Sequence, residues 1–581
     1  MAIIKVLNDN IANQIAAGEV VNRPASVVKE LMENSIDAGA TQITLIVKDA
    51  GKTLIQIIDN GCGMDRDDAQ VCFTPHATSK ISSADDLYSL QTMGFRGEAL
   101  ASIAAISFVE LRTKRKTDKA PTGTLVCVEG GEIKKVEEVL CDNGTSISVK
   151  NIFFNTPARR NFLKSDSIEN SHITEEFIRI ALCRNEIAFT CYSNDKLLFK
   201  LDKTPFRKRI TDIFGKRYEE KLLPITEETD IVSINGFISK IDLVRKSKDE
   251  QYFFVNGRFM RHPYFANAIS RAYTGLIPDG THPCFVVCLQ VKPENIDVNI
   301  HPSKTEIKFL DERFIYSILH AAAKRCLGLF ALETQIDWDL PTTIEFSPKP
   351  TDTPPKPPTI SYNPNYTPFK ANTDFDRPTP NPTELNIVLP QPTDTPPPPK
   401  PFQTAQKYIV VPHRESLVII NQQRASFKVL YDRFMSAAES VITPQKLLFP
   451  HNHFFNPAIS FRLLEFGAEL QRFGFEVAYK ADGSFDITAT PADFTIEQST
   501  DAIDQWLNDI ATMSDDDDQR RHHTAVTFAQ RLSIRNGQSL SEEEINSLLS
   551  QLYATADCEH TCLNERILIR ISPDRLDTLF Q

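Results

Sequence analysis

A proline-rich segment divides the chain into two arms and constrains its fold more than any other feature. Nineteen of the 36 prolines lie between Pro341 and Pro401, in a stretch without glycine. Proline fixes φ and lacks a backbone donor, so runs such as PPKPP and PPPPK favour extended polyproline II. Few apolar groups are available there to offset the entropy of ordering, so residues 341–402 are predicted to be a partly disordered linker.

The two arms that flank this linker are long enough to fold independently. The first 340 residues suffice for two domains, which we place at residues 1–215 and 216–340, and residues 403–581 suffice for a third. The hydrophobic content of 41% and the charged content of 24% are ordinary globular values. A net charge of −12 disfavours a strongly basic binder of duplex DNA, although it leaves room for a local basic groove.

The cysteines and the apolar runs indicate a soluble protein of a reducing compartment. Eleven cysteines are scattered without the spacing of a disulfide framework. Neither a cleavable signal nor a run of 18 apolar residues is present, so we expect the cytoplasm and no membrane partner. Cys62 and Cys72 are expected to be small buried fillers, and Cys284 and Cys288 to lie in the core.

Apolar periodicity in the first arm predicts an α/β fold, in which helices cover one face of a mixed sheet. Alternating apolar residues over 43–47 and an apolar run over 54–58 indicate paired strands. Residues 99–105 indicate a short helix behind a glycine loop. Later strands of the first unit are predicted over 125–128 and 146–149. A second α/β unit is predicted to carry strands over 252–255 and 284–290 and a helix over 263–273.

The stretch VVKELMENSIDA, residues 27–38, predicts an amphipathic helix with an acidic edge. At about 100° per residue, Glu30, Glu33, Asn34 and Asp37 share one narrow face, and apolar side chains cover the other. Taken alone, such an edge is more often a solvated face than a site. The residues that follow reverse that preference.

Two glycine motifs follow this helix. Asp59 ends a buried apolar strand in DNGCGM, where its carboxylate could accept a hydrogen bond from an exocyclic amino group. Gly61 and Gly63 allow close backbone approach, although an ordinary turn is the alternative. Further on, residues 78–80 (TSK) precede GFRGEAL at residues 94–100, which opens a helix. Free N–H groups, a helix N-terminus and a lysine suit a triphosphate.

The order of these motifs carries a clear resemblance. ELMENSIDAGA, DNGCGM, TSK with GFRGEAL, and NGTSISVKNIFFNTPARR resemble the four ATP-binding motifs of the GHKL ATPases. IANQIAAGEVVNRPASVVKEL, FFVNGRFM and IDVNIHPSKTEIKF are similar, more narrowly, to the MutL family of DNA mismatch repair proteins. The resemblance is close over residues 3–330, covers the linker only in character, and is looser over the last 180 residues. It implies a GHKL ATPase sandwich, a transducer domain and a C-terminal α/β dimerisation domain.

The resemblance assigns roles to residues whose chemistry already fits. Glu30 would be the general base that activates the attacking water, and Asn34 would ligate Mg²⁺. Asp59 would recognise adenine with help from Thr145. Lys304, in the second domain, would reach the γ-phosphate, so that domain orientation would depend on the nucleotide. The residues placed around ATP are Asn34, Asp37, Asp59, Gly61, Gly63, Met64, Thr78, Ser79, Lys80, Gly94, Phe95, Arg96, Gly97, Glu98, Ala99, Leu100 and Thr145.

Some assignments keep an alternative. Glu33 is either part of the site or only a solvated partner of Lys29, and Arg96 either touches phosphate or braces the lid formed by residues 94–100 and Lys80. By the resemblance, three arginines line a DNA groove with salt-sensitive, sequence-independent contacts, and the alternative is ordinary surface charge. These arginines are Arg258, Arg261 and Arg271.

The C-terminal arm departs from the family members that carry a metal-dependent endonuclease. Their D-Q-H-A-x-x-E-x-x-x-x-E motif corresponds to residues 421–432, where Asn421, Gln423 and Phe427 replace three ligands and only Asp432 remains. The later C-P-H-G-R-P motif resembles residues 562–567 without the histidine, and Gln530 stands where a cysteine is expected. Two cysteines, Cys558 and Cys562, do not make a zinc site. Endonuclease activity is therefore predicted to be absent.

QKLLFP at residues 445–450 resembles the short motif by which repair proteins bind the replication sliding clamp. A buried strand edge is the alternative. The clamp-motif residues are Gln445, Leu447, Leu448, Phe449 and Pro450.

The resemblance implies a homodimeric, Mg²⁺-dependent ATPase that closes around DNA and links a MutS-type mismatch-recognition protein to a helicase and a separate nicking endonuclease. Its expected location is the bacterial cytoplasm, with nucleoid association during repair. Two alternatives are a scaffold that binds ATP without useful hydrolysis and an endonuclease with unrecognised ligands.

Overall fold

The computed structural model describes most of both arms. The described residues are 17–18, 20–80, 93–94, 97–245, 247–278, 280–297, 307–335, 400–413, 416–436, 442, 444–480, 484–492, 494–510 and 517–579. The predicted linker, residues 341–402, lies almost wholly outside this set, and Lys304, Phe95 and Arg96 also lie outside it.

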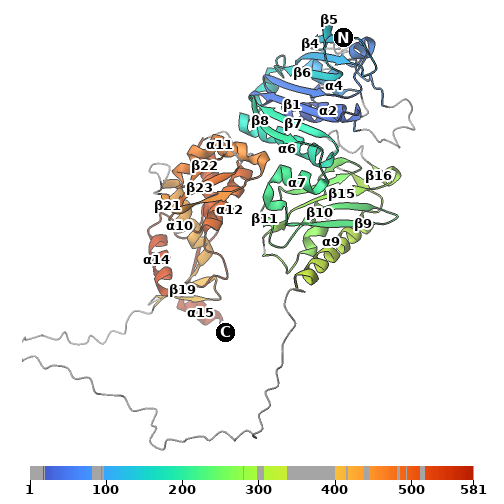
Figure 1. Cartoon of the computed structure of the whole chain (residues 1–581). Coiled ribbons are helices and arrows are strands. Elements are labelled where there is room, and N and C mark those ends of the chain that lie inside the picture. Colours follow the sequence, from blue (N-terminus) through green and yellow to red (C-terminus); the bar gives the residue numbers. More distant parts are fainter. Residues whose placement is uncertain are drawn as a thin grey trace, which may run out of the picture.

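The first unit is built on an eight-stranded mixed sheet (Figure 1). The strand order is β5-β4-β3-β6-β2-β1-β7-β8, and β1 pairs with β7 in parallel while the other neighbours are antiparallel. The strands are β1 (Gln42–Lys48), β2 (Leu54–Asp59), β3 (Phe108–Lys114), β4 (Thr122–Glu129), β5 (Glu132–Leu140), β6 (Gly144–Lys150), β7 (Ala188–Ser193) and β8 (Lys196–Leu201).

Two long helices of this unit, α2 (Pro24–Asp37) and α6 (Asp166–Cys183), pack against each other and bury their apolar sides in the core. Pro24 at the first helical turn suits the start of α2, because a proline there gives up no intrahelical hydrogen bond. The shorter helices are α3 (Arg66–Val71), α4 (Ala99–Ala105), α5 (Pro157–Asn161) and α7 (Phe206–Phe214), with the 3₁₀ turn η1 (Asp49–Gly51). A second 3₁₀ turn, η3 (Lys216–Tyr218), follows α7 at the start of the second unit.

The second unit has a five-stranded sheet in the order β13-β12-β15-β10-β9, with α8 and α9 packed on each other and α9 also against β9. Its helices are α8 (Pro263–Ala272) and α9 (Glu312–Gln335), with the 3₁₀ turn η4 (Pro293–Asn295). Its strands are β9 (Leu222–Glu228), β10 (Ser233–Ser239), β11 (Val244–Arg245), β12 (Gln251–Val255), β13 (Arg258–Met260), β14 (His282–Pro283), β15 (Phe285–Gln290), β16 (Ile296–Asp297) and β17 (Lys308–Phe309).

The C-terminal unit combines two small sheets, ordered β18-β19-β20-β24 and β21-β23-β22, with six helices among its described residues. The strands are β18 (Phe402–Thr404), β19 (Tyr408–His413), β20 (Ser416–Asn421), β21 (Pro444–His453), β22 (Glu476–Tyr479), β23 (Phe485–Pro491) and β24 (Leu568–Ile571). The helices are α10 (Gln422–Ser436), α11 (Pro457–Arg472), α12 (Ile496–Asp509), α13 (Asp517–Leu532), α14 (Glu542–Tyr553) and α15 (Pro573–Leu579).

The predicted elements are confirmed, within a few residues at their ends, as α2, β1, β2, α4, β4, β6, β12, β15 and α8. The expectation for Cys62 is wrong, because its side chain is exposed beside the turn that follows β2, whereas Cys284 is buried. The domain boundaries at residues 215 and 340 stay predictions. In the part of the chain that the structure describes, no helix is both long and apolar enough to cross a membrane.

Candidate functional site

The helix α2 has the predicted two-sided character. Val27, Val28 and Leu31 are almost completely buried, and Glu33 is also buried, with Lys29 at 4.0 Å. Glu30 is half-buried and has no hydrogen bond or ion pair to any described residue. The helix therefore presents one carboxylate whose lone pairs are available to a ligand or a water molecule.

Asp37 ties two loop segments to α2. Its Oδ1 accepts a hydrogen bond from Met93 N at 2.9 Å, and its Oδ2 accepts from Gly94 N at 3.1 Å and from Lys80 Nζ at 2.6 Å. Lys80 Nζ also donates to Asn34 Oδ1 at 2.9 Å. The acidic edge therefore holds the lysine of the TSK motif and the start of the glycine loop in place.

This arrangement also tests whether Asn34 suits Mg²⁺. Asn34 Oδ1 and Asp37 Oδ2 converge on one cation, the Lys80 ammonium, with contacts of 2.9 and 2.6 Å. Carboxylate and amide oxygens are the donors that a hard divalent cation prefers. The donor set fits the predicted metal, and Asn34 is the residue that would hold it.

Asp59 lies at the end of β2 and is buried, with 9% of its surface exposed. Its Oδ2 accepts from Ser35 Oγ and its Oδ1 from Gly61 N, both at 2.8 Å, and Thr145 on β6 is its register partner. Burial raises the pKa of the Asp59 carboxyl above its usual range, although these hydrogen bonds act in the opposite direction. The carboxylate is held rigidly with acceptor capacity to spare.

Two hydroxyl residues around Asp59 were missed by sequence reasoning. Ser35 comes from α2 and contacts Asp59 directly. Thr113, at the end of β3, accepts from Met64 N at 2.9 Å and lies 3.1 Å from Thr145 Oγ1. No sequence signal marks either residue, because a serine within a helix and a threonine within a strand are both common.

Two glycines of the predicted motifs have conformations that other residues rarely adopt. Gly63 has a φ of +69°, and a Cβ there would lie 2.0 Å from the Lys114 carbonyl oxygen. Gly97 has a φ of +64°, and a Cβ there would lie 2.5 Å from the Ala77 oxygen. Both turns therefore require glycine.

The other loop residues lie near these turns. Thr78 Oγ1 accepts from Lys80 N at 3.2 Å, and Ser79 is exposed. Glu98 lies 3.3 Å from His76 and precedes α4, which Ala99 and Leu100 begin.

The three arginines predicted at a DNA groove have different surroundings. Burial lowers the pKa of Arg258, and the carboxylates of α2 (Glu33, Asp37 and Glu30) act in the opposite direction, so its guanidinium lies close enough to the acidic edge for the charges to interact. Arg261 is exposed and lies 3.3 Å from Glu175, while Arg271 is exposed in the last turn of α8. DNA contact by any of them stays a prediction.

The stretch that replaces the endonuclease motif begins α10. Its surviving carboxylate, Asp432, lies 3.0 Å from Lys428 Nζ one turn earlier. Among the described residues, no group of three or more His, Cys, Asp or Glu side chains gathers where it could hold a metal ion.

A pocket of about 500 Å³ lies beside this stretch. Asn421 and Gln423 line it together with three basic side chains, and Glu565, 3.5 Å from Arg424, is the one carboxylate among the described residues that line it. The basic residues are Lys407, Arg424 and Arg531. Such a lining repels a divalent cation.

The clamp-motif residues lie on β21, where the pairing with β23 shifts between Lys446 and His451. Leu448 and Phe449 are 94% and 84% exposed, and Leu447 packs against the core. This exposure is against the alternative of a buried strand edge. Binding to a clamp stays a prediction.

Three family models match the chain. They are described as "Histidine kinase-, DNA gyrase B-, and HSP90-like ATPase" over residues 22–152, "DNA mismatch repair protein, C-terminal domain" over residues 210–328, and "MutL C terminal dimerisation domain" over residues 402–540. The chain therefore carries an ATPase domain and a dimerisation domain of these classes.

Full-length relatives agree with these matches. DNA mismatch repair protein MutL of Flavobacterium psychrophilum is 40% identical over an alignment of 615 positions, which covers 100% of this chain and 99% of that protein. MutL of Phocaeicola vulgatus is 40% identical over 627 residues, with 100% of both chains covered. A solved structure, the Aquifex aeolicus MutL ATPase domain complexed with ADP, is 24% identical with a TM-score of 0.37 and covers 52% of this chain and 98% of that one. The chain belongs to the MutL family of DNA mismatch repair proteins.

Proposed function

We propose that the protein is an ATP-driven matchmaker, which closes on DNA and couples mismatch recognition to downstream excision factors. The observation that supports this most is the acidic edge of α2. Glu30 has no hydrogen-bonded partner among the described residues and lies one turn before Asn34. The side-chain oxygens of Asn34 and Asp37 both contact the ammonium group of Lys80. A base beside a cation-binding oxygen pair is what hydrolysis of a metal-bound triphosphate requires.

In this proposal Glu30 orients the attacking water and takes its proton. A positioned general base contributes typically about 10²- to 10⁴-fold to a rate. Asn34 would hold Mg²⁺, which when bound neutralises phosphate charge. Asp59 accepts a hydrogen bond from the adenine amino group, with Thr145 beside it. Lys80 and residues 94–100 form the lid over the phosphates, and Met64, Thr78 and Ser79 lie around the nucleotide.

Closure would depend on the second unit. Lys304, which lies outside the described residues, would contact the γ-phosphate from that unit, so the orientation of the two units would follow the state of the nucleotide. The position of Arg258 supports such coupling, because a cation of the second unit lies within electrostatic range of carboxylates of α2.

The partners follow from the two arms. The dimerisation domain supports a homodimer whose N-terminal arms close around DNA, with Arg258, Arg261 and Arg271 as candidate phosphate contacts. A MutS-type protein would load it, and a helicase and a separate nicking endonuclease would act downstream. The exposed Leu448 and Phe449 support binding to the sliding clamp. The proposed location is the bacterial cytoplasm, at the nucleoid during repair.

We also propose that endonuclease activity has been lost. Three basic side chains and one paired carboxylate line the pocket beside residues 421–432, and Asp432 is paired with Lys428. Incubation of the dimer with supercoiled DNA and Mn²⁺ tests this: intact plasmid is expected. Nicking that disappears in an Asp432→Ala variant would contradict it and support an endonuclease with unrecognised ligands.

The test of ATP hydrolysis is Glu30→Ala, followed by single-turnover phosphate release and by nucleotide binding measured separately. We expect release to slow at least about 100-fold, from the contribution of a general base, with binding largely retained. Glu132→Ala, on the exposed strand β5, is the matched control. Hydrolysis by Glu30→Ala at a near-normal rate would reject Glu30 as the base. Negligible phosphate release by the unmodified chain would favour the non-hydrolysing scaffold.

A further inference from the structure

The C-terminal unit lies directly against the N-terminal half (Figure 1). Helix α11 packs along α6, and Ala458 of α11 is buried in the same apolar core as residues of the first and second units. Ser165 Oγ, just before α6, donates to Glu465 Oε2 of α11 at 3.2 Å. This contact joins segments 300 residues apart in the sequence.

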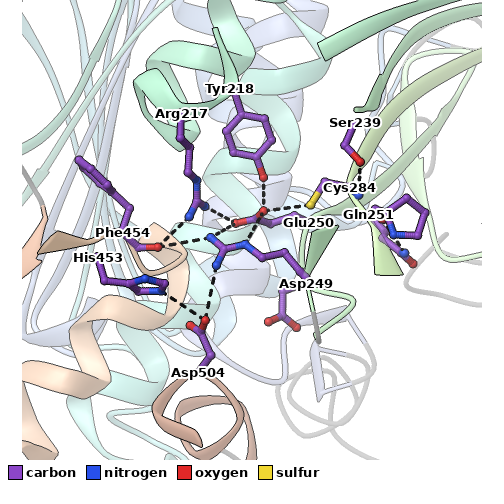
Figure 2. A network of polar contacts seen from close by, with 12 residues as sticks. Arg217, Tyr218, Ser239, Asp249, Glu250, Gln251, Cys284, His453, Phe454 and Asp504 are labelled. Atoms are coloured by element: carbon purple, nitrogen blue, oxygen red, sulfur yellow. Dashed lines mark hydrogen bonds and ion pairs between the residues drawn. The ribbon is translucent and has the colours of Figure 1, made fainter. Parts of the chain in front are cut away.

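A buried carboxylate organises the adjoining part of this surface (Figure 2). Glu250, which is 5% exposed, accepts hydrogen bonds from the Tyr218 hydroxyl and from Arg217 Nη2, the latter at 2.7 Å. Arg245 Nε lies 3.4 Å from Glu250, and Cys284 Sγ lies 3.3 Å away. Glu250 therefore holds two arginines side by side at the edge of the second unit.

Both arginines direct further donors to the C-terminal unit. Arg217 Nη1 and Arg245 Nη2 donate to the Phe454 carbonyl oxygen at 2.8 and 3.3 Å. Arg245 Nη1 lies 3.5 Å from Asp504 Oδ2, which is also 3.4 Å from His453 Nε2. Figure 2 shows this bridge from Glu250 through the two guanidinium groups to Phe454 and Asp504.

A second polar pair extends the contact. Asn508 Nδ2, one turn beyond Asp504 on α12, donates to Asp249 Oδ2 at 2.7 Å. Burial raises the pKa of Asp249, whose side chain is enclosed at the contact. The donors and acceptors of this surface are therefore paired with acceptors and donors of the C-terminal unit.

We propose that this face of the N-terminal half, formed by α6, Arg217, Arg245 and residues 249–250, is a docking surface for the chain's own C-terminal domain. The interaction is in cis, and it competes with closure. A linker of about 60 residues reaches up to about 200 Å when extended, so it permits both docked and released arrangements. Tethering keeps the local concentration high, so a modest interface suffices.

The docking surface includes residues of both N-terminal units, and for this reason we expect docking to compete with closure. Helix α6 belongs to the first unit, whereas Arg217, Arg245 and Glu250 lie at and beyond the start of the second. A rotation of one unit relative to the other would break the match with α11 and α12. This step rests on the proposed function, in which ATP reorients the two units.

Photo-crosslinking in the full-length dimer tests the docking. A benzoylphenylalanine is placed at position 465, which is exposed on α11 beside Ser165, and the crosslinked peptides are mapped. We expect crosslinks to α6. Mixing isotopically light and heavy chains, with time for subunit exchange, separates the arrangements: crosslinks within one isotope support docking in cis, and mixed crosslinks to α6 would overturn it.

Two variants and a control probe the polar contacts. Asp504→Arg opposes Arg245, and the isosteric Asn508→Asp places a second carboxylate against Asp249. Each is expected to reduce the α6 crosslink at least fivefold without changing the circular dichroism spectrum or the dimer mass. Glu497→Arg, two turns earlier on α12 and exposed, should leave the crosslink unchanged. An unchanged crosslink in Asn508→Asp would overturn the assigned surface.

The response to nucleotide tests the competition separately. A non-hydrolysable ATP analogue should reduce the wild-type α6 crosslink at least threefold. A crosslink that forms but ignores the analogue would reject competition with closure and leave the docking surface standing. Phosphate release by Glu30→Ala reports the proposed ATPase activity independently, so the two failures can be told apart.

Discussion

Replacing Asp59 with asparagine separates adenine recognition from structural support. Each carboxylate oxygen of Asp59 already accepts one hydrogen bond, from Ser35 Oγ and from Gly61 N, both at 2.8 Å. The Thr145 backbone also acts on this carboxylate. An ionised carboxylate has about four acceptor positions, so about one or two remain for a ligand. The asparagine side chain would keep the shape and one acceptor oxygen, but its NH₂ group would face donors.

The expected loss can be worked out from these contacts. A hydrogen bond to a charged group contributes about 1.5–3 kcal/mol, so Asp59→Asn should weaken ATP binding about 10- to 150-fold. The fold should tolerate the change, because burial raises the pKa of Asp59 and so opposes its charged form.

The assay compares two nucleotides by titration calorimetry. ATP carries the exocyclic amino group, and purine riboside triphosphate lacks only that group. Asp59→Asn should weaken ATP binding by the stated factor and purine riboside triphosphate binding by less than about threefold, a difference of under about 0.7 kcal/mol. Equal losses for both nucleotides would refute adenine recognition by Asp59 and leave it a structural role.

Three further predictions concern other parts of the chain. Asp37→Ala removes three hydrogen bonds to the loop segments, so the amides of Met93 and Gly94 should exchange hydrogen at least about tenfold faster, since a charge-assisted bond contributes about 1.5–3 kcal/mol. Burial lowers the pKa of His172 on α6 to about 4, so the unfolded chain binds the extra proton and stability falls as pH drops from about 6.5 towards 4. Between pH 7 and pH 5, the free energy of unfolding should therefore fall by about 1 kcal/mol less in His172→Gln than in the wild type, as measured by urea unfolding. The charged groups acting on His172 are Arg23, Glu175, Arg179 and Arg462. The double variant Leu448→Ala, Phe449→Ala should weaken sliding-clamp binding at least about tenfold, because burying each of these side chains in a partner contributes about 1.5–3 kcal/mol to binding. The melting temperature should not change.

The sequence predicted the framework of the candidate site well, for local reasons. Helical periodicity places Glu30, Asn34 and Asp37 on one edge of α2, and strand alternation places Asp59 at the end of β2. Both patterns depend on neighbours a few residues apart. The structure confirms these placements, although the catalytic roles stay predictions.

What the sequence could not predict depends on contacts between distant segments. Ser35 meets Asp59 only because α2 packs over β2, and Thr113 meets Met64 only because β3 ends beside the turn after β2. The anchoring role of Asp37 requires the loop to fold back over 56 residues. The contact between α6 and α11 crosses the linker, whose composition indicates only that the arms can move apart.

Helix α6 offers a direct route between the docked C-terminal domain and the ATP site, and linkage makes that route measurable. One side of α6 packs against α2, which carries Glu30 and Asn34, and another packs against α11. Close-packed helices shift together, so docking and nucleotide binding should be coupled. Coupling of two binding equilibria is reciprocal: if the ATP analogue weakens docking by a given factor, docking must weaken binding of the analogue by the same factor. Abolishing docking with Asn508→Asp should therefore tighten analogue binding by up to that factor, although Asn508 is on the C-terminal domain. Unchanged affinity alongside a nucleotide-sensitive crosslink would mean that the crosslink does not report the docking equilibrium, and it would reject coupling between docking and nucleotide binding.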